Sequence, residues 1–214
     1  YYAPNNAVLV LSGAFEVEEA KSLIEKYFGD IPAQPAPPPI DVNEPSEVAD
    51  DYREYEDKLA PFPAFLLGWK IPPRRNPEFN ALYLAGKLLY DGESSRLYQK
   101  LVKGDESVIQ LFGFTDERRG PSGVAIGAIP KPEKDLSQIR EIIMEEIQDL
   151  AKNGPTAEEM LKIQNQMIND TIRVRQSSLN RARELAEYTL YDGDPSYFNT
   201  ELEEFLAITP EQIR

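Results

Sequence analysis

The residue types that most often carry out catalysis are missing from this sequence or lie in isolation. Its 214 residues include no histidine and no cysteine, which removes the usual general base, the thiolate nucleophile and the usual zinc ligands. A serine nucleophile would then need a lysine partner, but no serine is followed by lysine three residues later. We therefore interpret Ser94 and Ser95 as helix-capping residues.

Carboxylates are abundant, and each group of them has a structural explanation. Glu16, Glu18 and Glu19 belong to the first turn of a predicted helix, where acidic side chains favour the helix dipole. Asp192-Gly193-Asp194 is typical of a helix end followed by a turn. The acidic stretch 41–57 lacks the spacing of a calcium-binding loop and is predicted to be solvated. We therefore predict no catalytic, cofactor-binding or metal-binding residue in this chain.

The net charge of −14 argues against a surface that follows nucleic acid phosphates. Arg173, Arg175, Arg181 and Arg183 are more typical of a solvated helix face paired with acids. No apolar run approaches the roughly 20 residues of a membrane helix. The chain does not begin with Met, and a capping box at 209–212 predicts that a helix begins close to the last residue. We expect a piece of a longer protein, truncated at both ends.

Two helices joined by a tight corner form the centre of the predicted fold. Apolar residues between Phe79 and Tyr90 have helical spacing, and Asn76-Pro77 supplies a predicted N-cap and first turn. Gly92 can adopt the left-handed conformation at the helix end, and Gly104 ends the second helix.

The remaining elements predict an α+β fold, a mostly antiparallel sheet with helices packed on one face. We expect one domain over 1–214, with a Pro-rich and acidic linker at 32–50. Predicted strands cover 7–12, 52–59, 65–71, 107–115 and 123–129, the last two as a hairpin, and predicted helices cover 17–28, 136–150, 156–191 and 194–207.

Two separated motifs give the chain a resemblance to a known family. The opening YYAPNNAVLV, which leads to KYFGDIP at 26–32, and the corner GESSRLYQKLV at 92–102 resemble the second domain of M16 zinc peptidases of the pitrilysin or insulinase type. The resemblance implies two halves that close around a chamber for extended peptides. It also implies that zinc is bound through H-x-x-E-H in the first domain, which this chain cannot carry.

The resemblance also concerns two positions just beyond the corner. In the half of such peptidases that lacks zinc, an Arg and a Tyr seven residues later help to hold the substrate, and the matching positions here are Val102 and Ile109. This departure favours an origin in the zinc-bearing half. The roles are not transferred to Arg96 and Tyr98, which lie at other positions.

Three functions follow as alternatives. The first is a non-catalytic domain that supports a zinc-bearing domain outside this chain, partnered by a second M16 half and a peptide substrate. The second is a peptidase-like scaffold subunit without catalysis. The third is an unrelated acidic interaction domain, which would lack the helix-backed sheet. The resemblance favours the bacterial periplasm or cell envelope.

Overall fold

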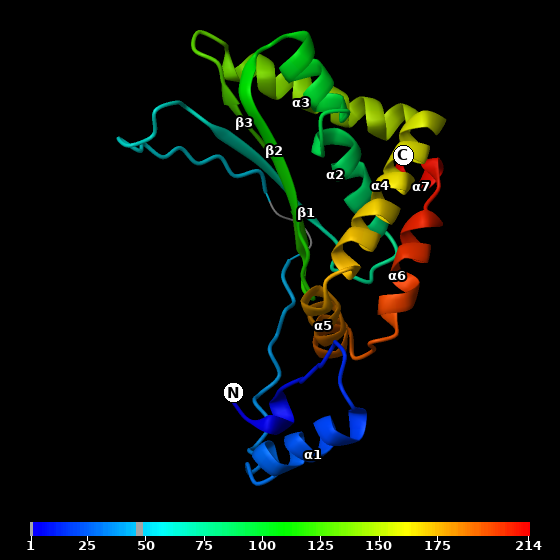
Figure 1. Ribbon diagram of the computed structural model, residues 1–214. Coiled ribbons are helices and arrows are strands. Elements are labelled where there is room, and N and C mark those ends of the chain that lie inside the picture. Colours follow the sequence, from blue (N-terminus) through cyan, green and yellow to red (C-terminus); the bar gives the residue numbers. More distant parts are fainter. Residues whose placement is uncertain (1, 46–48) are drawn as a thin grey trace. The chain divides into compact units, whose positions relative to one another are not determined.

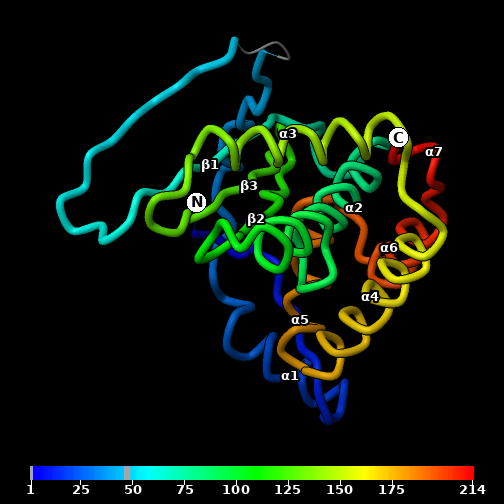
Figure 2. The backbone as a smooth tube through the Cα atoms, turned by 90° about the horizontal axis from the view of Figure 1, so that it is seen from above, coloured from blue at the N-terminus to red at the C-terminus, as the bar shows by residue number. Residues whose placement is uncertain are grey.

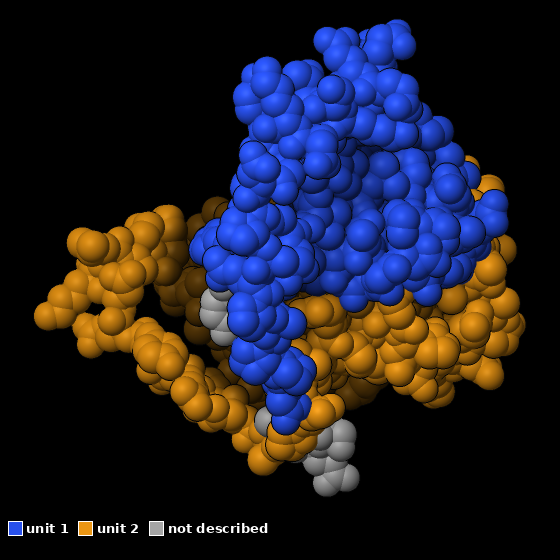
Figure 3. All heavy atoms as spheres, turned by 90° about the horizontal axis from the view of Figure 1, so that it is seen from below, with its two compact units in different colours: residues 1–41, 166–204 blue, residues 42–165, 205–214 orange. Residues whose placement is uncertain are grey.

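The computed structural model describes residues 2–45 and 49–214, which form two compact units. Unit 1 comprises Tyr1–Asp41 and Gln166–Glu204, and unit 2 comprises Val42–Asn165 and Phe205–Arg214. Figure 3 colours unit 1 blue and unit 2 orange. Each unit is described here by itself.

Unit 2 holds the sheet and the helices that cover it. Its middle strand β3 pairs antiparallel with β1 on one side and with β2 on the other. The predicted hairpin and the α+β fold class are therefore confirmed, and the helix-backed sheet excludes the third alternative. The elements are β1 (Phe65–Ile71), α2 (Phe79–Tyr90), the short π-helix η2 (Tyr98–Gly104), β2 (Val108–Asp116), β3 (Ser122–Pro130), α3 (Leu136–Asn153), the start of α4 (Ala157–Arg175) and α7 (Pro210–Ile213).

The two faces of this sheet differ in what lies on them. Helix α2 lies on one face (Figures 1 and 2), where the Tyr90 hydroxyl and Thr115 Oγ1 form a hydrogen bond of 3.1 Å. The Tyr90 ring lies so close over Gly113 that no side chain would fit there. Side chains alternate along a strand, so Leu66 and Phe114 point to the opposite face, which we call the open face.

The core of unit 2 lies between the helices and the covered face of the sheet. Removing these apolar side chains from water supplies the main driving force for folding. The fully buried apolar side chains are Phe79, Leu84, Leu88, Leu97, Leu101, Ile126, Ile139, Ile143 and Ile163.

The corner between α2 and η2 forms as predicted, with different capping contacts. Gly92 has φ of +77°, the left-handed conformation expected at the end of α2. Helix α2 begins at Phe79, and Asn76 instead accepts a hydrogen bond from the Glu78 amide in the preceding turn. The capping role predicted for Ser94 or Ser95 is wrong for the buried Ser95, whose hydroxyl donates to the Gly92 carbonyl.

Gly92→Val should lower the free energy of unfolding by about 1–2 kcal/mol, because a β-branched residue is strained at positive φ. No atom lies within 4 Å of the added Cβ, so the cost comes from backbone strain and not from a clash. Urea denaturation followed by circular dichroism measures it. A variant with unchanged stability would contradict the corner conformation.

Unit 1 is built from helices and extended chain. It contains η1 (Pro4–Asn6), α1 (Val17–Phe28), the later part of α4, α5 (Ser178–Glu187), the short π-helix η3 (Tyr188–Asp192) and most of α6 (Tyr197–Leu206). Helix α1 has the predicted bounds and ends at Gly29. The proline-rich connector 32–39 has no regular structure, as predicted.

Two predicted strands are wrong. Residues 7–12 and 52–59 form no strand, and Leu9 and Tyr52 are largely exposed. A strand requires a hydrogen-bonded neighbour, and the only sheet in the described residues contains β1, β3 and β2 alone. Apolar composition by itself does not provide that neighbour.

The long helix predicted over 156–191 is also wrong in part, because α4 ends at Arg175. Ser177 caps a new helix by accepting a hydrogen bond from the Asn180 amide. Arg181 donates to the carbonyl of Arg175 at 2.7 Å, which satisfies an otherwise unpaired group at the end of α4. Local capping therefore divides the segment with helical apolar spacing into two helices.

Candidate functional site

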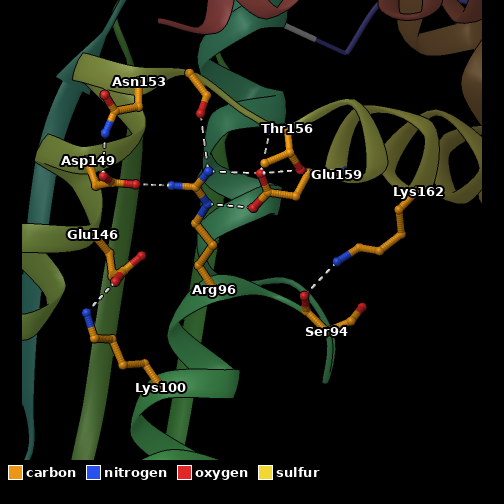
Figure 4. Close-up of polar contacts among 10 residues, drawn as sticks. Ser94, Arg96, Lys100, Glu146, Asp149, Asn153, Thr156, Glu159 and Lys162 are labelled. Atoms are coloured by element: carbon orange, nitrogen blue, oxygen red, sulfur yellow. Dashed lines mark hydrogen bonds and ion pairs between the residues drawn. The ribbon is translucent and has the colours of Figure 1, made fainter.

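Arg96, at the corner after α2, lies at the centre of a polar network within unit 2 (Figure 4). Its Nε and Nη2 donate to the two carboxylate oxygens of Glu159 at 2.6 and 2.9 Å. Its Nη1 donates to Asp149 at 2.9 Å, and Nη2 also donates to the Gly154 carbonyl at 3.3 Å. One guanidinium therefore joins the corner to the end of α3 and the start of α4.

The local sequence explains why these partners face Arg96. Gly154, with φ of +72°, ends α3. Thr156 and Glu159 form the predicted capping box: each side chain accepts a hydrogen bond from the other residue's backbone amide. The box fixes the Glu159 carboxylate at the start of α4, where it can accept two parallel hydrogen bonds from an arginine.

The hydrogen bonds of the network favour the charged forms of Arg96, Glu159 and Lys100. The hydrogen bonds from Arg96 lower the pKa of Glu159 to about 2, against the opposing effect of its partial burial. The same pairing raises the pKa of Arg96. Lys100 binds Glu146 at 2.6 Å, which raises the pKa of Lys100.

A carboxylate with such a low pKa stays ionised at neutral pH and does not exchange protons there. A general acid or base works best when its pKa lies near the operating pH. The pKa of Glu159 is too low for either role at neutral pH. The network holds three segments together by charge-assisted bonds. We call it the Arg96 staple, consisting of Arg96, Asp149, the Gly154 carbonyl and Glu159.

The two positions singled out beyond the corner lie in different elements. Val102 is half-buried in η2, whereas Ile109 is exposed at a bulge of β2, between Val108 and Gln110. Tyr98, also in η2, has the Lys103 ammonium 5.7 Å from the centre of its ring. The proposed absence of the substrate-holding pair remains a prediction from the sequence.

Several of the other acidic candidates have structural partners. Glu18 binds Lys21 one turn along α1. Asp194 accepts a hydrogen bond from the Ser196 amide at the start of α6; its bonds with Ser196 lower the pKa of Asp194. Within the acidic stretch 41–57, residues 46–48 lie outside the described residues, and Arg53 binds Asp51.

Two of the four arginines predicted to lie on a solvated, salt-bridged face stabilise the helix break in unit 1. Arg175 binds Glu184 at 3.0 Å and lies 4.0 Å from the centre of the Phe198 ring. Arg181 donates to the end of α4 and to Ser178. These two side chains are engaged within the fold.

The donor set of this chain does not suit the zinc ion that the resemblance implies. Zinc in proteins is held mainly by imidazole and thiolate groups, and the sequence has neither. Among residues 2–45 and 49–214, no three carboxylates converge in a way that could hold a metal ion. No step of zinc chemistry is therefore assigned to this chain.

A cavity of about 260 Å³ opens where α3 begins, lined by Asp105, Lys134 and Asp135 among others. Asp135 accepts a hydrogen bond from the Ser137 amide and so caps α3. The charges around the cavity have mixed signs, and this arrangement points to no particular ligand.

The sequence interpretation missed the Arg96 staple and the open face. The partners of Arg96 lie 53 and 63 residues away in the chain, so no local spacing indicates them. The open face had a visible signal in the alternation of β1, where the exposed Leu66 and Gly68 alternate with half-buried residues.

Comparison with known proteins identifies relatives of this chain. The model of the peptidase M16 inactive domain matches residues 1–167. No curated protein matches the sequence significantly.

Three solved structures have the same fold. A protease from Helicobacter pylori has a TM-score of 0.78 and 20% identity, over 94% of this chain and 49% of its own. A chain of complex III2 from Candida albicans has a TM-score of 0.77 and 14% identity, over 94% and 49%. The periplasmic protease PqqL from Escherichia coli has a TM-score of 0.68 and 15% identity, over 94% and 22%. The chain thus spans about half the length of the first two.

Proposed function

Because this chain belongs to the family of peptidase M16 inactive domains, we propose that it is the non-catalytic domain of a zinc metalloendopeptidase. In this proposal it supports a zinc-bearing domain outside the chain and forms part of the wall of a peptide-enclosing chamber. A second M16 half completes the chamber, and extended peptides are the substrate.

Two findings together support the proposal. The family match covers residues 1–167, while the sequence contains no histidine with which to bind the catalytic zinc. A domain with this fold and without zinc ligands contributes by packing and by enclosing the substrate. The Arg96 staple suits that role, because it fixes the helices behind the sheet without offering a reactive group.

The 214-residue chain should bind no zinc stoichiometrically and cleave no peptide. Metal analysis after dialysis and a quenched fluorescent peptide assay measure the two properties. This result is expected because the sequence lacks the imidazole and thiolate groups that usually bind zinc. One tightly held zinc ion per chain would overturn the expectation.

The parent protein provides the decisive test of the proposed function. An H-x-x-E-H motif preceding Tyr1 in the longer polypeptide, together with zinc-dependent peptide cleavage by that polypeptide, would support it. A parent protein without the motif and without cleavage would contradict the proposed function and would favour the scaffold alternative.

The scaffold alternative is supported by one specific comparison. A chain of complex III2 from Candida albicans matches 94% of this chain with a TM-score of 0.77. In this second candidate function, a peptidase-like subunit contributes to protein assembly without catalysis. Metal content and cleavage by the parent protein distinguish the two candidates.

We further propose the periplasm or cell envelope of a bacterium as the location of the parent protein. The similarity to a periplasmic protease supports this location. Among the described helices, none combines the length and apolarity needed to cross a membrane. Fractionation of cells that express the tagged parent protein tests the location.

A further inference from the structure

Asn153 and Gly154 form the C-terminal end of α3, directly beside the Arg96 staple (Figure 4). Among the asparagines of the sequence, only Asn153 is followed by glycine. Glycine has no Cβ, so nothing on that residue shields its backbone nitrogen from the preceding side chain. An asparagine followed by glycine is therefore the one that reacts most readily with the backbone.

The reaction open to this pair is deamidation through a cyclic imide. Hydroxide from the solvent removes the proton of the Gly154 amide, and the nitrogen attacks the side-chain carbon Cγ of Asn153. The new N–Cγ bond forms, the Cγ–Nδ2 bond breaks, and ammonia leaves after taking a proton from water. Water then opens the imide ring at either carbonyl, which gives aspartate or isoaspartate. The net reaction consumes one water and releases one ammonia.

The structure places the reacting atoms in the last turn of a helix. The Asn153 side chain is exposed, whereas Gly154 is buried. The Gly154 amide donates to the Leu150 carbonyl at 2.9 Å, and Asn153 Nδ2 donates to Asp149 at 2.6 Å. Both bonds must open before the nitrogen can attack. Such opening is local, because helix ends open at a lower free energy than the whole fold.

The Arg96 staple restrains this opening, because it holds both partners of the reacting pair. Arg96 donates to the Gly154 carbonyl at 3.3 Å. It also donates to one carboxylate oxygen of Asp149, whose other oxygen accepts the bond from Asn153. Loss of Arg96 from this position would release the carbonyl and the carboxylate together.

We propose that Asn153 is a site of spontaneous deamidation in the folded chain, and that the Arg96 staple limits its rate. The product has a new carboxylate beside Asp149, at the end of α3 where the helix dipole is negative. Repulsion between the two carboxylates weakens the hold of Asp149 on Arg96. The modification therefore loosens the staple that restrains it. This inference does not depend on the proposed function.

Incubation of the full 214-residue chain in mildly alkaline buffer tests the proposal. Peptide mass spectrometry measures the gain in mass at each asparagine, and chromatography separates the aspartate and isoaspartate peptides. We expect Asn153 to react before every other asparagine in the folded chain, and more slowly than in the chain unfolded by urea. An Asn153 that stays unmodified in the folded chain, while the unfolded chain reacts to completion, would overturn the proposal.

Two variants test the restraint by the staple. Asp149→Ala removes the acceptor of Asn153 and one partner of Arg96, but leaves the bonds between Arg96 and Glu159. It should accelerate deamidation about fivefold, the effect of losing one hydrogen bond from a helix end that opens locally. Arg96→Met should accelerate it as well. If Arg96→Met does not fold, Asp149→Ala decides by itself.

Two further variants provide the controls. Asn153→Gln should abolish the modification, because attack on the longer side chain would require a larger ring. Gly113→Val introduces a clash with the Tyr90 ring, away from the end of α3, and should leave the rate unchanged under conditions where the chain stays folded. Equal acceleration by Gly113→Val and Asp149→Ala would assign the reaction to unfolding of the whole chain and overturn the proposal. An unchanged rate in Asp149→Ala, or equal rates in the folded and unfolded chains, would also overturn it.

Discussion

Arg96→Met is expected to lower the free energy of unfolding by about 3 kcal/mol, because it leaves the Glu159 carboxylate partly buried without its cation. Methionine replaces the apolar stem of the arginine side chain and removes the guanidinium group, so the packing of the stem changes little. The variant also removes the bonds to Asp149 and the Gly154 carbonyl. Urea denaturation followed by circular dichroism measures the loss.

Lys162→Met provides the matched control for loss of a cation. Lys162 donates to the Ser94 carbonyl in an exposed position, so its replacement should cost no more than about 0.5 kcal/mol. A loss below about 1 kcal/mol for Arg96→Met would show that the staple contributes no more than an ordinary surface pair.

The dependence of stability on pH provides a second readout of the staple. The pKa of Glu159 falls from 4.5 to about 2 in the folded chain. A lowered folded pKa adds stability that is fully present above the unfolded value and is lost as the pH falls from about 4.5 towards 2. Arg96→Met should lose less stability over this window than the unchanged chain, because Glu159 then titrates nearer its ordinary pKa. Denaturation at a series of pH values measures the difference.

Gly113→Val is expected to destabilise the chain by about 3 kcal/mol, at the upper end of the usual cost of overpacking. The new Cβ would lie 2.5 and 2.7 Å from the Cδ atoms of the Tyr90 ring. Tyr90 cannot move away cheaply, because its ring lies between α2 and the sheet and its hydroxyl bonds to Thr115. Thermal and urea denaturation measure the effect.

Gly68→Val is the matched control, with the same substitution in the same sheet but on the open face. Because a Cβ at Gly68 meets no atom within 4 Å, this variant should be as stable as the original or slightly more stable. Similar losses in the two variants would show that α2 does not pack closely on the face that holds Gly113.

Family membership and most elements could be predicted from local signals. The capping boxes at Thr156 and Thr209 began helices where predicted, because their hydrogen bonds close within three residues. The hairpin of β2 and β3 was also predictable, because a short polar turn joins its two apolar runs. The left-handed conformation of Gly92 was predictable for the same reason, because the end of a helix depends on residues that are close in the sequence.

The errors have two different physical causes, a missing long-range partner in one case and local competition for backbone hydrogen bonds in the other. The apolar run at 7–12 has the composition of a strand and still forms none, because a strand requires a hydrogen-bonded neighbour that composition does not specify. The predicted long helix instead breaks after Arg175, where competing side-chain bonds to the backbone favour two helices.

The sequence alone determined the fold class, the family and the lack of zinc ligands, since residue types and local spacing encode these properties. Only the tertiary structure decided the role of Arg96 and the character of the open face. Arg96 meets Asp149 and Glu159 across 53 and 63 residues of chain. Leu66 and Phe114 lie on the same face of the sheet only because β3 pairs with both of their strands in one particular register. Such long-range pairing is set by the packing of the whole sheet and its helices, which no local pattern specifies.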